Sequence, residues 1–110
     1  MIKHIVMFKL KEEANGKSAY ENAIELKEKA LNLKNLITEI KAIEVGINSS
    51  QAPKTNYDIA LVCDFESIED LNAYQIHPDH KAFGEYISQL RTERACIDYE
   101  YEIEKLLIES

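Results

Sequence analysis

The chain is poor in the residues that make linkers, disulfide scaffolds and membrane spans. Its 110 residues include three glycines, two prolines, two cysteines and no tryptophan. Few glycines and prolines are typical of an ordinary globular chain, and at 110 residues we expect one domain that covers residues 1–110. No apolar run approaches the roughly 20 residues that a membrane-spanning helix needs. Cys63 and Cys96 cannot make a zinc site by themselves, and free buried thiols are the default in a reducing compartment.

Positive charge is also scarce. Thirteen lysines and arginines stand against 20 aspartates and glutamates, which gives a net charge of −7. Binding to phosphate groups draws on clustered basic side chains, so neither nucleic acid nor an anionic membrane is expected as a partner. The opening MIKHIVMFKL is too short and too interrupted by charge for a signal peptide. We therefore expect a cytoplasmic protein.

Four stretches alternate apolar and polar residues with the period of a β-strand. They are residues 2–10, 40–48, 57–65 and 95–103. In the last stretch the apolar row from Ala95 to Ile103 is expected to face the core, which would turn Cys96 and Asp98 to the other side of the sheet. Cys63 lies in the apolar row of its own strand, so the two thiols are predicted on opposite faces, and a disulfide between them is not expected.

Helical spacing fills the gaps between these strands. Ser18 with Glu21, and Ser67 with Asp70, have the spacing of capping boxes, each followed by apolar residues at intervals of three and four. The resulting order is strand, helix, strand, strand, helical pieces, strand. This order predicts a ferredoxin-like α+β fold, in which a four-stranded antiparallel sheet carries helices on one face.

The sheet face away from the helices is apolar at its centre in this prediction. The residues expected there are Ile5, Met7, Ala60, Val62 and Cys96. A face of this kind is seldom left wet, and a second copy packed sheet to sheet would cover both faces at once. We therefore predict a homodimer that associates through its sheet faces.

The stretch LNAYQIHPDHKAFG holds two of the three histidines and one of the two prolines. Proline is best tolerated in the first turn of a helix, so one helix should end near His77 and a second should start at Pro78. Tyr74 would then point inward from the first helix. His80 would sit in the opening turn of the second helix and share its inward stripe with Phe83, so that a tyrosine and a histidine face one cavity.

This pairing has the elements of acid–base catalysis. The partial positive charge of a helix N-terminus disfavours a cationic imidazole, so His80 is expected to be neutral and able to act as a general base. The Tyr74 phenol could donate a proton or hold a carbonyl oxygen. His4 and Phe8 share the apolar row of the first strand that should look toward these two residues, so His4 is the third catalytic candidate and Phe8 a lining residue.

Structural roles compete with this interpretation. Tyr74 and His4 could be satisfied core residues, while His77 and His80 cap the junction between two helices. The chain would then be a small-ligand-binding protein or a stress-associated structural dimer without turnover. Metal binding through His77, Asp79 and His80 is a weaker alternative, because Pro78 disrupts the helical spacing, and no metal or other cofactor is expected.

Four segments resemble the stress-responsive dimeric A/B barrel (Dabb) family over almost the whole chain. They are KHIVMFKLKE, IKAIEVGIN, YDIALVCDFESIEDLNAYQIHPDHKAF and ACIDYEY, of which the HPDH motif three residues after a tyrosine is the most specific. The resemblance implies ferredoxin-like dimers whose sheets form a shared barrel. Most of the family has no assigned activity, so it implies the fold more strongly than the function.

One plant member of the family cyclises a linear polyketide thioester by aldol condensation. The resemblance implies that its catalytic tyrosine and histidine fall on Tyr74 and His80, and that further histidines match His77 and His4. Another of its histidines falls on Ile59, so part of that polar lining is replaced here by an apolar side chain. Cofactor-free monooxygenases also occur among related dimeric barrels. The implied activity is acid–base chemistry on a small carbonyl or aromatic, polyketide-like substrate, by a cyclase, an isomerase or a monooxygenase-like enzyme.

Overall fold

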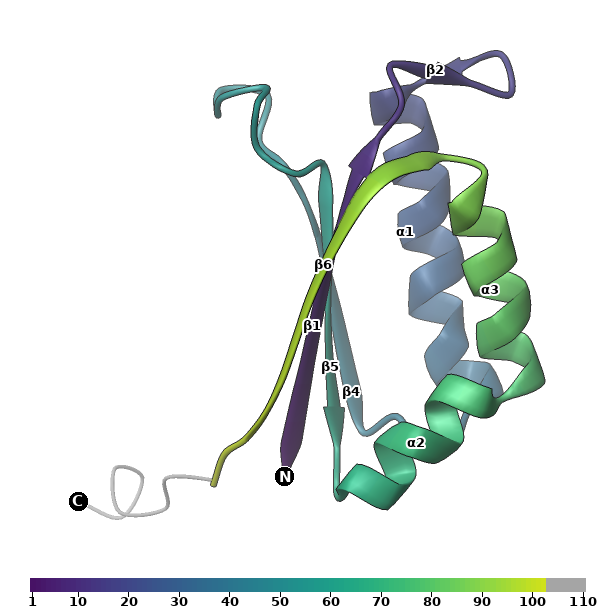
Figure 1. The fold of residues 1–110 in the computed structure, drawn as a ribbon, viewed down its shortest axis with the longest axis vertical. Helices are drawn as coiled ribbons and strands as arrows, with labels where there is room; N and C mark the ends of the chain where they lie inside the picture. Colours follow the sequence, from purple (N-terminus) through teal and green to yellow (C-terminus); the bar gives the residue numbers. More distant parts are fainter. Residues whose placement is uncertain (103–110) are drawn as a thin grey trace.

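The computed structural model describes residues 1–102. Within them the chain forms a four-stranded antiparallel sheet, a short hairpin and three helices. The elements are β1 (Ile2–Leu10), β2 (Glu13–Ala14), β3 (Lys17–Ser18), α1 (Ala19–Leu36), β4 (Ala42–Ile47), β5 (Ile59–Phe65), α2 (Ile68–Ile76), α3 (Pro78–Ser88) and β6 (Arg91–Glu100). The sheet order β4-β5-β1-β6, with the helices on one side, is the predicted ferredoxin-like α+β fold (Figure 1).

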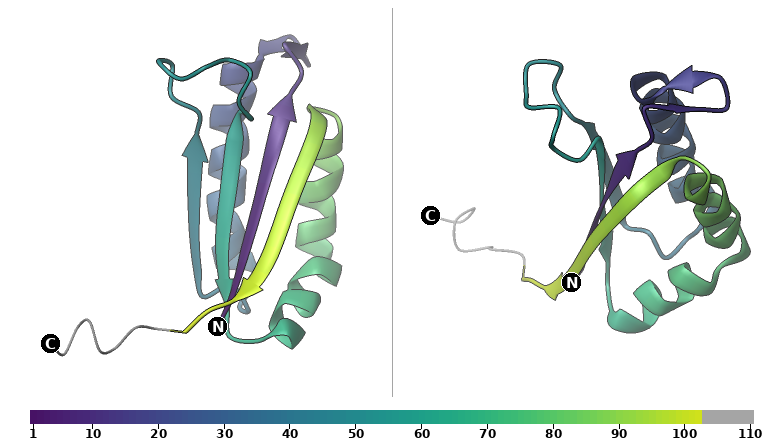
Figure 2. Two further views of the ribbon diagram at one scale, coloured as in Figure 1. Left: turned by 60° about the vertical axis from the view of Figure 1, so that its left-hand side comes forward. Right: turned by 45° about the horizontal axis from the view of Figure 1, so that its top comes forward.

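The helices form a single layer over one sheet face and leave the other face uncovered. α1 and α3 run side by side along the sheet, and α2 crosses at its lower end (Figures 1 and 2). The inward row of β1, from Ile2 through Val6 to Leu10, is buried against this layer together with Leu26 and Leu33 of α1. The core therefore lies between the sheet and the helices.

The helix starts follow their predicted capping residues. Ser18 and Glu21 make a complete capping box before α1, because the Ser18 hydroxyl accepts from the Glu21 N–H and the Glu21 carboxylate accepts from the Ser18 N–H. At α2 only the forward half forms, in which the Ser67 hydroxyl accepts from the Asp70 N–H at 3.2 Å. These two N-terminal caps stabilise α1 and α2 at the positions that the sequence predicts.

The sequence-based orientation of the last strand is wrong. Cys96 pairs with Val6 and Asp98 pairs with His4, so both face the helix layer, whereas Ile97 pairs with Ile5 on the uncovered face. Period-two alternation defines two faces but does not say which one meets the core. β6 is an edge strand whose apolar row points outward. Both cysteines are free, although they lie on the same face of the sheet.

Two local features were not predicted. Residues 13–18 form a tight hairpin with Asn15 and Gly16 both at positive φ (55° and 75°), a turn geometry that favours Asn-Gly. A register shift in the β1–β6 ladder places Leu10 opposite Arg91 although Lys9 lies opposite Glu93, so β6 contains one extra residue there. Ile103, expected at the end of the last strand, lies outside the described residues.

Within residues 1–102, none of the helices combines the length and apolar character that crossing a bilayer requires.

Candidate functional site

A pocket of about 110 Å³ opens between the sheet and α3. It is lined by His4, Val6, Phe8, Leu61, Tyr74, His80, Phe83, Gly84, Ile87, Arg91 and Arg94. Its walls are apolar side chains of β1, β5 and α3, and its polar groups are two histidines, one tyrosine and two arginines. Ligand and active sites are usually apolar hollows with a few convergent polar groups, and this pocket has that character in a small volume.

Tyr74 and His80 meet in this pocket. The break between α2 and α3 falls at His77, as predicted, with Pro78 at the first position of α3. This break turns α3 so that the His80 ring lies against the Tyr74 ring, with centroids 4.3 Å apart. Phe65 packs behind Tyr74 at 5.0 Å. The tyrosine is therefore held between a core aromatic ring and the imidazole.

One ring nitrogen of His80 is already occupied. Nδ1 lies 3.2 Å from the backbone carbonyl oxygen of Gln75, which can only accept a hydrogen bond. This contact favours the tautomer with the proton on Nδ1 and leaves the Nε2 lone pair free. Burial is the largest influence on the ring and lowers the pKa of His80, against the opposing hydrogen bond to Gln75; His4 and Arg94 lower it further. From the sequence we expected the helix N-terminus to keep His80 neutral. In the structure, burial of the ring is the main cause of its lowered pKa.

Tyr74 is 1% exposed, and burial raises the pKa of its phenol, which keeps it protonated. Its hydroxyl makes no hydrogen bond within residues 1–102. In that part of the chain no fully buried polar side-chain atom lacks a partner, so the hydroxyl must open onto the pocket. A protonated phenol with no protein acceptor is available as a donor to a ligand oxygen.

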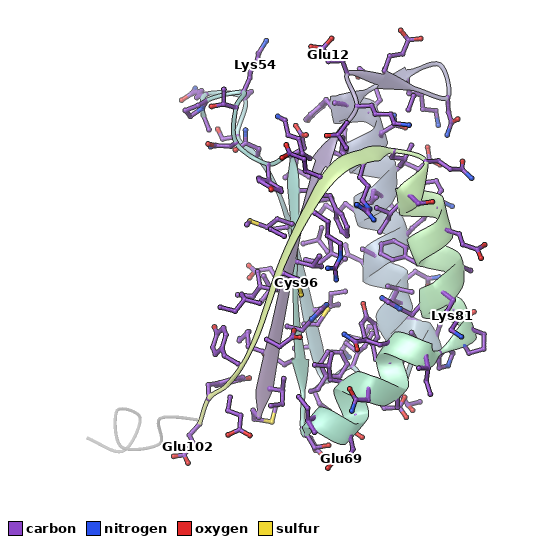
Figure 3. The ribbon with its side chains drawn as sticks, in the orientation of Figure 1. Glu12, Lys54, Glu69, Lys81, Cys96 and Glu102 are labelled. Carbon is purple, nitrogen blue, oxygen red and sulfur yellow. The ribbon has the colours of Figure 1, made fainter. Side chains whose placement is uncertain are left out.

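His4 forms a second polar group in the pocket wall. Its Nδ1 lies 2.5 Å from a carboxylate oxygen of Asp98, and the Cys96 sulfur lies 3.6 Å from the same nitrogen. Figure 3 labels Cys96 near the middle of β6. In the described part of the chain, this is the only group of three or more His, Cys, Asp or Glu side chains whose ligand atoms come close enough together to share a metal ion. The alternative set of His77, Asp79 and His80 does not meet that spacing.

The pocket gathers five of the seven residues singled out from the sequence. His4, Phe8, Tyr74, His80 and Phe83 all line it. Two others lie elsewhere. His77 caps α3, its Nδ1 accepting from the Asp79 N–H at 3.1 Å, and Ile59 is a buried residue at the start of β5.

Sequence reasoning missed four polar residues of the site. Asp98 and Cys96 were assigned to the wrong sheet face, and Arg91 and Arg94 were not considered at all. The signal for the arginines was present, because they are the only two in the chain.

A larger open groove of about 720 Å³ lies on the opposite sheet face, beneath the loop at residues 48–57. It is lined by Met7, Gly46, Ile47, Asn48, Ser49, Ala52, Thr55, Asn56, Tyr57, Ile59 and Ala60. No histidine, cysteine or charged side chain contributes to it. Tyr57 is its one titratable side chain, with no base beside it, and we place the candidate active site in the smaller pocket.

Comparison with known proteins places this geometry in context. The model of the stress responsive A/B barrel domain matches residues 2–101. Olivetolic acid cyclase of Cannabis sativa is 28% identical over 99 residues, which cover 89% of this chain and 94% of the relative.

Two solved structures are also similar. A dimeric protein of unknown function with a ferredoxin-like fold from Bacteroides fragilis has a TM-score of 0.79 and 34% identity, over 91% of this chain and 95% of the other. A dimeric ferredoxin-like protein of unknown function from Thermobifida fusca has a TM-score of 0.76 and 27% identity, over 91% and 90%.

Proposed function

The chain belongs to the stress responsive A/B barrel domain family, and from that premise we propose that it is an enzyme that moves protons next to a carbonyl group. In this proposal His80 is the general base and Tyr74 holds the carbonyl oxygen. The substrate is a small carbonyl compound or an aromatic or polyketide-like molecule. The likeness to a plant cyclase supports a reaction of this class.

The proposal depends on the protonation states of the adjacent His80 and Tyr74 rings. His80 has one nitrogen hydrogen-bonded to Gln75 and a lowered pKa, while Tyr74 has a raised pKa and a hydroxyl that opens onto the same pocket. A neutral imidazole beside a protonated phenol is the combination that removes a proton from carbon while stabilising the oxyanion that forms.

His80 and Tyr74 are sufficient for every proton transfer and hydrogen bond that the reaction needs. His80 Nε2 takes the proton from the carbon next to the carbonyl, and the resulting enolate oxygen accepts a hydrogen bond from the Tyr74 hydroxyl. The enolate carbon then bonds to a second carbonyl carbon of the substrate, and the imidazolium returns its proton to the new alkoxide. If no second carbonyl is in reach, the proton returns to carbon and the reaction is an isomerisation or an exchange.

The pocket limits how much of a substrate it can enclose. A cavity of roughly 150 Å³ takes one benzene molecule, so about 110 Å³ holds a fragment smaller than an aromatic ring. A larger substrate must therefore extend from the pocket past the two arginines. The enclosed part would be the reacting carbonyl and its neighbouring carbon.

Proton exchange tests the proposal directly. In D₂O the protein should accelerate loss of the α-proton NMR signal of 4-oxopentanoate above the rate of buffer and of heat-denatured protein. A native protein that gives the buffer rate with this probe, and with a panel of diketones and aryl ketones, would count against catalysis.

The dependence of this rate on pH should follow the lowered pKa of His80. The neutral imidazole is the active form, so the rate is lost as pH falls through the pKa of His80 and is constant above it. Since that pKa lies below the ordinary value of 6.5, the midpoint should also lie below 6.5. The measurement is the exchange rate across the acidic range, with free imidazole as the comparison. A midpoint at or above 6.5 would contradict the assignment of His80 as the base.

A non-catalytic ligand-binding or stress-associated dimer is the second candidate. The observation that favours it is the small volume of the pocket, in which Tyr74 is almost fully buried and packs as core. Under this function, a ligand found by thermal shift would bind to the pocket without any change in its covalent structure. Incubation of each hit with the protein, followed by NMR, separates the two functions.

We also propose that the chain is a homodimer that associates through the uncovered sheet face. That face carries Ile5, Met7, Val62, Ile97 and Tyr99, with Ile97 59% exposed. An exposed apolar surface of this kind is unfavourable in water, and burial in a two-fold interface removes it. The structures from Bacteroides fragilis and Thermobifida fusca are described as dimeric, which supports a dimer but does not bear on which face forms it.

Replacing Ile97 by glutamate should break the dimer, because a carboxylate from each protomer would be buried in the proposed interface without a partner. The control is Ile76→Glu on α2, where an isoleucine that is 70% exposed lies away from the sheet. Sedimentation velocity should show a monomer for Ile97→Glu and an unchanged dimer for Ile76→Glu. A wild-type chain that sediments as a monomer, or a dimer that survives Ile97→Glu, would overturn the proposed interface.

A further inference from the structure

The two arginines of this chain both line the same pocket. The other basic side chains are lysines, and Lys3, Lys9, Lys17 and Lys41 pair with carboxylates in the described residues. Neither Arg91 nor Arg94 has a salt bridge within residues 1–102, although the chain carries 20 acidic residues. Guanidinium groups that have no carboxylate partner in the described part of the chain, and that line a pocket with a histidine and a tyrosine, can bind an anion.

A β-bulge brings the two arginines together. In a regular strand, residues three apart point to opposite faces, so Arg91 and Arg94 would diverge. The register shift between Lys9 and Leu10 adds one residue to β6, and Arg91 lies opposite Leu10 while Arg94 lies opposite Phe8. Leu10 and Phe8 both face the helix layer, so the shift returns both arginines to that side. Bulges commonly re-aim a side chain next to an active site.

The positive charge of Arg94 influences the pKa values of both reacting groups. It contributes to the lowered pKa of His80 and opposes the raised pKa of Tyr74. A guanidinium presents two parallel N–H groups that match the two oxygens of a carboxylate, a geometry that lysine cannot provide. The use of arginine here, in a chain that uses lysine elsewhere, therefore indicates a planar oxyanion.

We propose that Arg91 and Arg94 form a carboxylate-binding subsite at the mouth of the pocket, so that the substrate is an oxo acid with its carbonyl group between Tyr74 and His80. The position of the carbonyl group in this inference rests on the proposed function. The anion subsite itself does not depend on that function. The carboxylate anchors the molecule outside the small cavity and leaves the reacting carbon inside it. Both arginines are positioning residues in this arrangement.

The test compares one oxo acid with its uncharged ester. At low salt, binding of 4-oxopentanoate and of methyl 4-oxopentanoate is followed through the NMR shifts of the His80 ring protons. We expect the wild type to bind the acid roughly tenfold more tightly than the ester, the scale of one charge-assisted hydrogen-bonded pair. Arg94→Gln should remove that preference, Arg91→Gln should reduce it, and Arg94→Lys should restore only part of it.

Lys81→Gln is the matched control. Lys81 is an exposed basic residue next to His80 in sequence, labelled on the helical side of the molecule in Figure 3, and it does not line the pocket. Its replacement changes the net charge by the same amount and should leave the preference intact. Equal wild-type binding of acid and ester, no detectable binding of the acid, or a preference that survives Arg94→Gln and Arg91→Gln together would overturn the inference.

The same measurement on His80→Gln, followed through the Tyr74 ring protons, separates this inference from the proposed function. A preference for the acid in both proteins, with no proton exchange by the wild type, supports the subsite and rejects the enzyme. Proton exchange in the wild type without any preference rejects the subsite and leaves the enzyme.

Discussion

His80→Gln should slow the proton exchange of 4-oxopentanoate by about 10²–10⁴-fold, the usual contribution of a general base. Glutamine is similar in size and its side-chain amide can still donate to the Gln75 carbonyl, so the half-buried site stays filled and its polar contact is kept. It lacks the basic nitrogen, however, and cannot accept a proton from carbon. The loss should therefore appear in the chemical step and not in folding.

Two further variants make this result specific. Tyr74→Phe removes only the hydroxyl that opens onto the pocket and should also slow exchange, while Lys81→Gln, one residue from His80 and exposed, should not. The melting temperature of each variant is recorded alongside the rate. A His80→Gln protein that is folded and retains most of the wild-type rate would show that the imidazole is not the base.

Phe65→Ala should lower the free energy of unfolding by about 3–5 kcal/mol. Phe65 is fully buried, and its ring packs 5.0 Å from the Tyr74 ring and 6.5 Å from the His4 ring, measured between centroids. Truncation removes apolar contacts and leaves a cavity beside the Tyr74 and His4 rings. Since a domain of this size has a total stability of roughly 5–15 kcal/mol, the variant should be close to unfolding.

Urea denaturation followed by circular dichroism measures this loss. Tyr20→Ala is the control, because Tyr20 is an aromatic residue that is 64% exposed, and its replacement should change stability by less than about 0.5 kcal/mol. Phe65→Leu should fall between the two, since leucine fills part of the volume. A loss below about 1 kcal/mol for Phe65→Ala would mean that the packing around Tyr74 readjusts freely, and that Phe65 does not hold the tyrosine in place.

The fold was predictable because its signals are local. Alternation in β1 and β5, apolar spacing in α1, and the capping serines Ser18 and Ser67 each specify an element without reference to the rest of the chain. The break between α2 and α3 was predictable for the same reason, since Pro78 fixes it in sequence. The order of these elements then leaves few topologies, and the ferredoxin-like sheet is one of them.

The site was less predictable because it depends on pairing between distant strands. His4 and Asp98 come together only through the register of β1 and β6, and the sequence gives no measure of which β6 row faces the helices. The bulge that turns Arg91 inward is likewise a property of the ladder and has no glycine or proline to mark it. Residues whose orientation follows from spacing within a single helix, such as Tyr74 in α2 and Phe83 in α3, were easier to place in the pocket.

The interruption at Pro78 also sets the chemistry of the imidazole that follows it. In an unbroken helix the Gln75 carbonyl would receive the amide hydrogen of Asp79, four residues later. Here that amide donates to the His77 ring instead, and the Gln75 oxygen is left to orient His80. Pro78 does not line the pocket, yet the helix break that it causes favours the His80 tautomer with hydrogen on Nδ1. The reactivity of the imidazole therefore depends on the backbone two residues upstream.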